Sequence, residues 1–418
     1  MELRAGYKQT EVGSILEEWD AVLVGDFFTF KNGLNKAKHF FGHGTPIVNY
    51  MDVFGRTALH VEELRGRVEV SKAELKAYEV CRGDVFFTRT SETIDEIGVA
   101  SVLLGEAEQT VFSGFVLRAR PTVDALVDEF KSYCFSPRYF RQQVTTRASY
   151  TTRALINGRS LSATFLAKPP KPEQIAIATA LSDVDALLGA QDALIAKKRA
   201  IKQGAMQELL TGKRRLPGFS GEWEVKQLGR LLESPVTDGP HLTPKFIDRG
   251  VPFLSVNNLV DGKIDWTDLR YISDGDHREF SRKCRPRKGD ILFGKAASVG
   301  MVALVETEIE FNIWSPIALI RVAPQLSARF VYRQLQSGFV EKQVLLLTNS
   351  SSQGNIGMGD IERLEIAYPR TREEQVAIAA LLDDLDYEIT ALETQRAKTA
   401  QLKQGMMQAL LTGRIRLV

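Results

Sequence analysis

Glu173 to Pro217 reads EQIAIATALSDVDALLGAQDALIAKKRAIKQGAMQELLTGKRRLP, and Glu374 to Val418 reads EQVAIAALLDDLDYEITALETQRAKTAQLKQGMMQALLTGRIRLV. The two segments align without a gap at a constant offset of 201 residues (374 − 173), and nearly half of their positions are identical. A repeat of this kind has to be recognised before a fold is proposed, because each copy folds as the same structural unit. We therefore expect a chain of two similar halves.

Each copy has the apolar spacing of one long helix. Ile177, Leu181 and Val184 recur at steps of three or four, and the second copy repeats the pattern. A Thr-Gly pair near the end of each copy is typical of a helix stop. The 39 residues from Glu173 to Thr211 would make a rod of roughly 60 Å at 1.5 Å per residue. A rod with one apolar seam needs a partner helix, and we expect the two copies to pair with each other.

Gly204 and Gly405 occupy the same place inside the two predicted helices. Glycine costs about 1 kcal/mol relative to alanine in a helix interior, so one explanation is a tolerated weakness. Because the same exception occurs in both copies, we expect a close approach of two backbones at these positions.

The composition is that of a globular protein. Of the 418 residues, 44% are hydrophobic and 25% are charged. No apolar run approaches the roughly 18 residues of a membrane span, and the N-terminal sequence has no hydrophobic signal core. Cys81, Cys134 and Cys284 lie far apart, which argues against a disulfide framework or a zinc site. We expect two or three domains, a cytoplasmic location and no membrane contact.

The net charge is only +2, but the basic residues are unevenly distributed. Residues 27–51 and 130–172 contain no Asp or Glu, and residues 281–305 contain only one acid, Asp290, among six Lys and Arg side chains. Local positive fields of this kind suit phosphate binding. A scatter of solvated charges is the alternative.

The repeat extends beyond the helices into two globular regions. Arg82-Gly-Asp-Val-Phe-Phe in the first half and Lys288-Gly-Asp-Ile-Leu-Phe in the second both place a Gly-Asp turn before an apolar strand. Short strands with a few helices predict a mixed α/β globule of about 150 residues in each half. The expected helical segments are residues 123–135 and 327–344.

Two polar loops fall at nearly the same place in the halves, at residues 145–153 and 348–355. Both are rich in hydroxyl, amide or guanidinium groups and contain no carboxylate, which suits contact with base edges and phosphates. The loops differ in sequence although the surrounding segments are alike, as expected if one frame presents two different reading surfaces. A flexible polar loop is the alternative interpretation.

No catalytic signature is present. The Asn/Asp-Pro-Pro-Tyr/Phe pattern of amino-methyltransferases is absent, and the Gly-x-x-x-x-Gly-Lys sequence at residues 289–295 is followed by Ala296 where a phosphate-binding loop needs Ser or Thr. His39 and His43 have metal-like spacing, but no third ligand is evident. We expect no active site and no metal site.

The duplicated order of these motifs resembles the specificity (S) subunit of type I restriction–modification systems, over the entire chain. The resemblance rests on the paired helices that begin with Glu-Gln and end L-L-T-G, on Thr237-Asp-Gly-Pro-His-Leu-Thr-Pro and on Gly250-Val-Pro-Phe-Leu. It implies an α+β (mixed α/β) fold with two target-recognition domains separated by two long helices in an antiparallel coiled coil. The implied divisions are residues 1–168, a spacer helix at 169–216, residues 217–368 and a second spacer helix at 369–418.

The resemblance also implies a non-catalytic, DNA-binding role. Each globular domain would read one half of a bipartite target in double-stranded DNA, and the helices would set the spacing and dock two modification (methyltransferase) subunits. Adenine-N6 methylation with S-adenosylmethionine and DNA cleavage with ATP and Mg would belong to the modification and restriction subunits, with no cofactor on this chain. The alternatives are a recognition subunit of a methylation-only system, a coiled-coil scaffold with protein-binding globules, and an autonomous nuclease or methyltransferase.

Candidate residues follow from the motifs and loops. Thr88-Arg89 and Gly294-Lys295 directly follow the matched Gly-Asp strands and should emerge at equivalent rims. The predicted DNA-contacting residues are Lys31, Lys36, Thr88, Arg89, Arg147, Tyr150, Arg153, Asp238, His241, Lys245, Lys295, Asn349, Ser350 and Gln353. The predicted partner-binding residues on the helices are Asp183, Asp185, Lys202, Gln203, Asp384, Asp386, Lys403 and Gln404.

Overall fold

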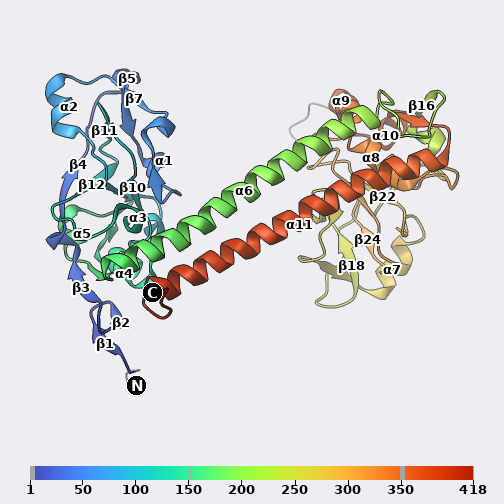
Figure 1. The fold of residues 1–418 in the computed structure, drawn as a ribbon. Coiled ribbons are helices and arrows are strands. Elements are labelled where there is room, and N and C mark those ends of the chain that lie inside the picture. The colour runs from blue at the N-terminus through green and yellow to red at the C-terminus, as the bar shows by residue number, and fades with distance from the viewer. Residues whose placement is uncertain (1–4, 151, 349–353, 418) are drawn as a thin grey trace. The chain divides into compact units, whose positions relative to one another are not determined.

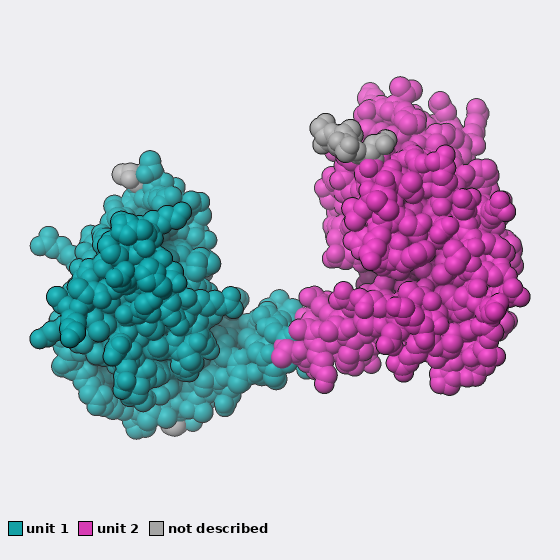
Figure 2. Space-filling model, turned by 90° about the horizontal axis from the view of Figure 1, so that it is seen from above, with its two compact units in different colours: residues 1–192, 394–418 teal, residues 193–393 magenta. Residues whose placement is uncertain are grey.

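The computed structural model describes residues 5–150, 152–348 and 354–417. It divides into two compact units, unit 1 with residues 1–192 and 394–418 and unit 2 with residues 193–393 (Figure 2). Each unit holds one globular region together with a part of helix α6 (Lys171–Leu209) and a part of helix α11 (Arg372–Leu410). Both helices have the predicted length of 39 residues but begin and end two residues earlier than expected.

Unit 1 is built on a five-stranded sheet of order β4-β12-β8-β10-β6. Figure 1 labels β4, β12 and β10 of this sheet. Its strands are β1 (Tyr7–Thr10), β2 (Gly13–Leu16), β3 (Asp20–Leu23), β4 (Phe28–Asn32), β5 (Phe41–Val48), β6 (Ala58–Leu59), β7 (Arg67–Val68), β8 (Val85–Thr88), β9 (Thr90–Ser91), β10 (Ala100–Leu103), β11 (Val111–Phe112), β12 (Val116–Pro121), β13 (Ser149–Tyr150), β14 (Ala154–Leu155) and β15 (Phe165–Lys168). The globule's helices are α1 (Tyr50–Val53), α2 (Lys72–Tyr78), α3 (Asp128–Lys131), α4 (Arg138–Arg147) and α5 (Gly158–Ser162). The predicted strand after Gly83-Asp84 is β8, which is buried along its whole length because it lies in the middle of the sheet.

Unit 2 repeats this plan with a four-stranded sheet of order β17-β25-β22-β23. Its strands are β16 (Trp223–Gln227), β17 (Thr237–Asp238), β18 (Val251–Leu254), β19 (Leu259–Val260), β20 (Lys263–Ile264), β21 (Arg270–Ile272), β22 (Ile291–Gly294), β23 (Val302–Leu304), β24 (Asn312–Ile313), β25 (Ile317–Ile320) and β26 (Glu365–Pro369). The globule's helices are α7 (Asp274–Phe280), α8 (Ala328–Leu335), α9 (Gly338–Leu347) and α10 (Met358–Arg363). The mixed α/β fold class is confirmed in both units.

In two segments that were predicted to be helical, the structure differs in detail from the prediction. Residues 123–135 contain only the single turn of α3, and residues 327–344 contain two helices, not one. Ser337 ends the continuity of the second segment because its hydroxyl accepts a hydrogen bond from the Val340 amide and so starts a new helix.

The two long helices pack antiparallel within each unit. In unit 1, Asp185 of α6 pairs with Lys403 of α11 at 2.5 Å and Asp192 pairs with Arg396 at 2.9 Å, so the α11 number falls as the α6 number rises. In unit 2, Lys202 pairs with Asp386 at 2.5 Å and repeats the Asp185–Lys403 contact with the roles of the helices exchanged. The expected antiparallel pairing is thus confirmed inside each unit.

Gly204 and Gly405 do not mark a close approach of backbones. A Cβ atom added at either position would meet no atom of the described residues within 4 Å, and both glycines lie on an exposed helix face. The expectation of backbone contact within the chain is therefore wrong.

The repeated Glu-Gln pair fastens the start of each long helix to its globule. In unit 1, the buried Glu173 accepts hydrogen bonds from the Trp19 indole at 2.9 Å and from Arg416 at 3.2 Å. In unit 2, the buried Glu374 accepts two hydrogen bonds from the guanidinium of Arg215, each at 2.5 Å.

The glutamine that follows binds backbone groups. Gln174 accepts a hydrogen bond from the Val127 amide, and Gln375 accepts one from the Ser327 amide, both at 2.8 Å. Such buried side chains stabilise a junction only when they are fully hydrogen-bonded, which explains why both members of the pair recur.

Candidate nucleic-acid interface

In unit 1, the central strands bring Asn32 and Arg89 to one end of the sheet. Asn32 on β4 is paired with Leu117 on β12, and Leu117 is paired in turn with Phe87 on β8. Arg89 comes two residues after Phe87, just beyond the end of β8. Asn32 and Arg89 are therefore placed by the register of the sheet, with Asn32 exposed.

Unit 2 has the same register with different residues. Asp238 on β17 is paired with Ala318 on β25, and Ala318 is paired with Phe293 on β22. Lys295 follows two residues after Phe293. Asp238 thus corresponds to Asn32, and Lys295 corresponds to Arg89.

The chain just after each predicted polar loop packs beside Arg89 in unit 1 and beside Lys295 in unit 2. In unit 1, β14 lies beside β9, and the amide of Ile156 donates to the carbonyl of Arg89 at 3.0 Å. In unit 2, the amide of Ile356 donates to the carbonyl of Lys295 at 3.0 Å. One frame therefore presents a polar edge in each unit. We define the polar edge of unit 1 as Asn32, Arg89, Phe115, Tyr150 and Arg153, and that of unit 2 as Asp238, His241, Lys283 and Lys295.

The polar edge of unit 1 contains the half-buried guanidinium of Arg89. Arg89 donates to the carbonyl of Gly114 at 3.3 Å, and its Nε atom is buried with no partner among the described residues. Tyr150 is 57% exposed and donates to the carbonyl of Glu92 at 3.4 Å, while Arg153 lies 3.7 Å from the Glu92 carboxylate. Phe115 is 62% exposed, and its carbonyl accepts from the Arg89 amide.

The polar edge of unit 2 is organised by a buried carboxylate. Asp238 is fully buried, and its two oxygens accept hydrogen bonds from Lys283 and Lys295, each at 2.5 Å. The exposed ring of His241 lies 3.5 Å away. Burial by itself raises the pKa of the Asp238 carboxyl, but the hydrogen bonds from the two lysines outweigh burial and hold the pKa below its ordinary value.

The structure brings some predicted DNA-contacting residues together and separates others. Arg89, Tyr150 and Arg153 meet at one edge, and so do Asp238, His241 and Lys295. Arg147 is exposed at the last position of α4, two residues before β13, and Lys245 is exposed in the segment after β17. The predicted residues Asn349, Ser350 and Gln353 lie outside the described residues.

Three predicted residues have internal partners. Thr88 is fully buried and donates to the carbonyl of Glu96 at 2.9 Å. Lys31 donates to the carbonyl of Ala77, and Lys36 forms an ion pair with Glu74 at 2.9 Å. Asp238, like Thr88, is fully buried. Neither residue therefore exposes side-chain surface for a direct DNA contact. The predictions of direct contact at these two positions do not fit their burial.

The predicted partner-binding residues divide in a similar way. Asp185, Lys202, Asp386 and Lys403 form ion pairs between the long helices. The other four residues, Asp183, Gln203, Asp384 and Gln404, are exposed.

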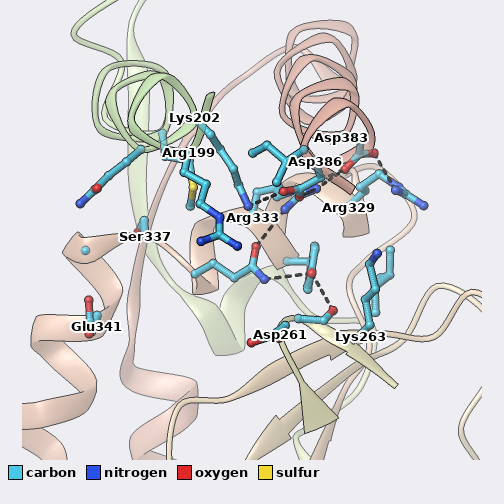
Figure 3. A pocket seen from close by; sticks show the side chains of 18 of the residues that line it. Arg199, Lys202, Asp261, Lys263, Arg329, Arg333, Ser337, Glu341, Asp383 and Asp386 are labelled. Atoms are coloured by element: carbon cyan, nitrogen blue, oxygen red, sulfur yellow. Dashed lines mark hydrogen bonds and ion pairs between the residues drawn. The ribbon is translucent and has the colours of Figure 1, made fainter. Parts of the chain in front are cut away.

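A groove of about 1630 Å³ lies in unit 2 between the two helices, α8 and the β19–β20 hairpin. Figure 3 shows Arg333 from α8 between acidic side chains of α11, at 2.5 Å from Asp383 and 2.7 Å from Asp386. Lys202 also binds Asp386, and Arg329 binds Asp383 at 2.6 Å. Burial opposes the charge of Asp386, but Lys202 and Arg333 outweigh it and lower the pKa of this carboxyl. The groove is lined by equal numbers of basic and acidic side chains, so it has no excess positive charge to attract DNA.

No group of three or more His, Cys, Asp or Glu side chains is arranged to hold a metal ion in residues 5–150, 152–348 and 354–417. Within the same ranges, none of the helices is long and apolar enough to cross a membrane.

Comparison with known proteins places this fold in a family. Residues 220–404 match the family model described as the type I restriction modification DNA specificity domain. A Methanocaldococcus jannaschii protein named as the MjaX specificity subunit of a type I restriction enzyme is 24% identical over 98% of this chain and 96% of its own length. The EcoBI specificity subunit of Escherichia coli is 22% identical over 64% of this chain and 61% of its own.

Two solved structures have the same fold along nearly the whole chain. The type I restriction–modification S subunit from M. genitalium has a TM-score of 0.58 at 14% identity, covering 98% of both chains. A chain from a structural study of complex assembly and conformational transition in the type I R-M system also has a TM-score of 0.58, at 17% identity, over 96% of this chain and 99% of its own. The chain is thus similar to type I restriction–modification specificity subunits along nearly its whole length, and residues 220–404 match their DNA specificity domain. The resemblance inferred from the sequence is thus confirmed.

Three residues at the polar edges carry no motif and are not among the predicted site residues. Asn32 and Phe115 become recognisable only through strand register, since each is an isolated residue in the sequence. Lys283 lies in the basic segment 281–305, but only the fold shows that it reaches Asp238. The basic segment in the sequence therefore pointed to Lys283, but the sequence did not indicate that Asp238 is its partner.

Proposed function

We propose that this chain is the DNA sequence-recognition subunit of a type I restriction–modification complex. Each unit would read one half of a bipartite site with its polar edge. The observation that carries the proposal is that matched positions of one sheet register hold Asn32 and Arg89 in unit 1 but Asp238 and Lys295 in unit 2, where the buried Asp238 binds Lys295 and the exposed Lys283. A common frame with different donors and acceptors suits the recognition of two different half-sites.

The contacts at the edges divide by chemistry. Arg89 has the planar donor geometry that suits the O6 and N7 atoms of guanine. Tyr150 and Phe115 provide exposed rings for base or methyl contacts, and Arg153 and Arg147 provide charge for phosphates. The chain itself would carry no catalysis, and methyl transfer and cleavage would belong to the modification and restriction subunits with S-adenosylmethionine, ATP and Mg.

The long helices would dock two modification subunits and set the spacing between half-sites. Their exposed Asp183, Gln203, Asp384 and Gln404 side chains lie at positions repeated in both copies. Deleting one heptad from each helix removes about 10 Å of helix, or about three base pairs. We expect a correspondingly shorter unread spacer, and an unchanged spacer would contradict the role of the helices in spacing.

The deciding experiment is long-read mapping of methylated adenine in the host genome with and without this gene. We expect deletion to abolish methylation at one interrupted motif with two defined halves. If the map is unchanged, the purified chain with its modification subunits should be tested for duplex binding. Failure to bind any duplex would contradict DNA recognition and favour a scaffold whose globules bind protein.

A further inference from the structure

Asp238, Lys283 and Lys295 form a hydrogen-bonded cluster. Neither the sequence motifs nor the family likeness explains why two lysines bind this one carboxylate. Each carboxylate oxygen of Asp238 accepts a hydrogen bond from a different lysine, Oδ1 from Lys283 and Oδ2 from Lys295. Lys283 has a second acceptor, the carbonyl of Gly239 at 3.3 Å. The cluster therefore holds the two ammonium groups in defined places.

The cluster carries a surplus positive charge that faces outward. Two ammonium groups and one carboxylate leave a net charge of +1. The Asp238 side chain is fully buried and Lys295 is 11% exposed, whereas Lys283 is 51% exposed. The charge that is open to solvent is thus that of Lys283.

In unit 2, Lys283 lies in the connection between α7 and β22, which is longer than the connection between α2 and β8 in unit 1. In unit 1, α2 ends at Tyr78, six positions before Asp84 (84 − 78), whereas in unit 2, α7 ends at Phe280, ten positions before Asp290 (290 − 280). Asp84 and Asp290 are equivalent anchors, because each carboxylate accepts from the backbone amide three residues earlier. The four additional residues in unit 2 let the chain bring Lys283 to the polar edge.

We propose that Lys283 contacts a phosphate of the DNA bound by unit 2 and that Asp238 is the positioning residue that holds its ammonium group at the polar edge. This inference rests on the function proposed above. A phosphate fits better than a base, because an ammonium group is a compact charge with rotatable donors, while base discrimination favours a planar fork. Holding a long lysine side chain in place also reduces the conformational entropy lost on binding.

The test of the contact is the salt dependence of DNA binding by the full chain, with its modification subunits if these are required for binding. The probe is a fluorescein-labelled 30-base-pair duplex of mixed sequence. For Lys283→Met, we expect the slope of log K against log salt concentration to fall by about one, the value for one lost phosphate contact. Lys283→Arg should restore the slope.

Lys288→Met is the matched control. Lys288 is 58% exposed, carries the same charge and lies before the start of β22, at the opposite end of the strand from Lys295. We expect this variant to keep the wild-type slope. A wild-type slope for Lys283→Met, or equal losses in the two variants, would overturn the phosphate contact.

Asp238→Asn tests positioning against simple charge neutralisation. The substitution raises the net charge of the cluster from +1 to +2, so a purely electrostatic role predicts tighter binding. A positioning role predicts binding about three- to tenfold weaker to a duplex carrying the mapped target, with thermal melting used to verify folding. Tighter binding would overturn the positioning role. If the wild-type complex binds no duplex at all, the proposed function itself fails, and if it binds while Lys283→Met behaves as wild type, only this inference fails.

Discussion

The two polar edges share one frame and differ in how their cations are held. In unit 1, the buried Nε atom of Arg89 has no hydrogen-bond partner among the described residues, and the neutral, exposed Asn32 stands at the matched register. In unit 2, Lys295 is bound to a buried carboxylate that also binds Lys283. The difference shows how a duplicated scaffold can diverge at its surface through a few side chains while the register beneath them stays the same.

The junctions between helix and globule differ in the same manner. Glu173 is shared between Trp19 and Arg416, whereas Glu374 is occupied by Arg215 in a bidentate pair. The indole Nε1 of Trp223, the counterpart of Trp19, is buried without a hydrogen-bond partner in the described part of the chain. The two junctions therefore use one glutamate for different partners.

The largest effect is expected at these junctions. Glu374→Gln removes the charge from a buried bidentate pair and should destabilise unit 2 by about 2 kcal/mol. Glu173→Gln should cost unit 1 less, because the new amide oxygen can still accept from Trp19 and because Arg416 is 38% exposed. Urea titration with hydrogen exchange resolved for each unit measures both, and equal losses would show that the junctions are energetically alike.

The next effect concerns Arg89 of unit 1. Arg89→Ala should relax discrimination at one base pair of a single half-site by about 2 kcal/mol, within the range for a bidentate guanine contact. Arg65→Ala, at another exposed arginine of unit 1, is the control. Competition binding with singly substituted duplexes provides the measurement. A uniform loss across all sequences would reassign Arg89 to phosphate contact.

A smaller effect is expected at the repeated helix glycines. Gly204→Ala and Gly405→Ala should each stabilise the free chain by about 0.5 to 1 kcal/mol, because the added methyl group meets no atom and the helix propensity improves. Thermal melting of the free chain measures this gain. If the variants also assemble less well with modification subunits, a partner backbone uses these positions, and if both properties improve, the glycines are unoccupied in the complex.

The smallest effect is the pH dependence that Asp386 contributes to the stability of unit 2. The pKa of Asp386 is lowered because Lys202 and Arg333 outweigh the opposing effect of burial. A group with a lowered folded pKa contributes stability above its unfolded pKa of about 4, and that stability is lost as the pH falls through the folded value. Asp386→Asn should therefore reduce stability at pH 7 and flatten its decline below about pH 4. An unchanged acid profile in unit 2 would contradict this role.

Much of the architecture followed from local patterns in the sequence. A three-to-four residue apolar period over 39 positions requires a long helix with one buried stripe, and its repetition at an offset of 201 requires a second. The Gly-Asp turns located β8 and β22 because such turns precede apolar strands in both halves. Local periodicity and turn chemistry carry this information without reference to distant residues.

The sequence by itself thus determined two similar mixed α/β halves, two paired helices and the absence of a recognisable catalytic motif. Only the tertiary structure decided which side chains meet at each edge. The pairing of Asp238 with Lys283 and Lys295, and the correspondence of Asn32 with Asp238, depend on strand register and on a four-residue difference in a connecting segment. Contacts between residues some 45 to 57 positions apart arise from chain closure, which no local pattern encodes.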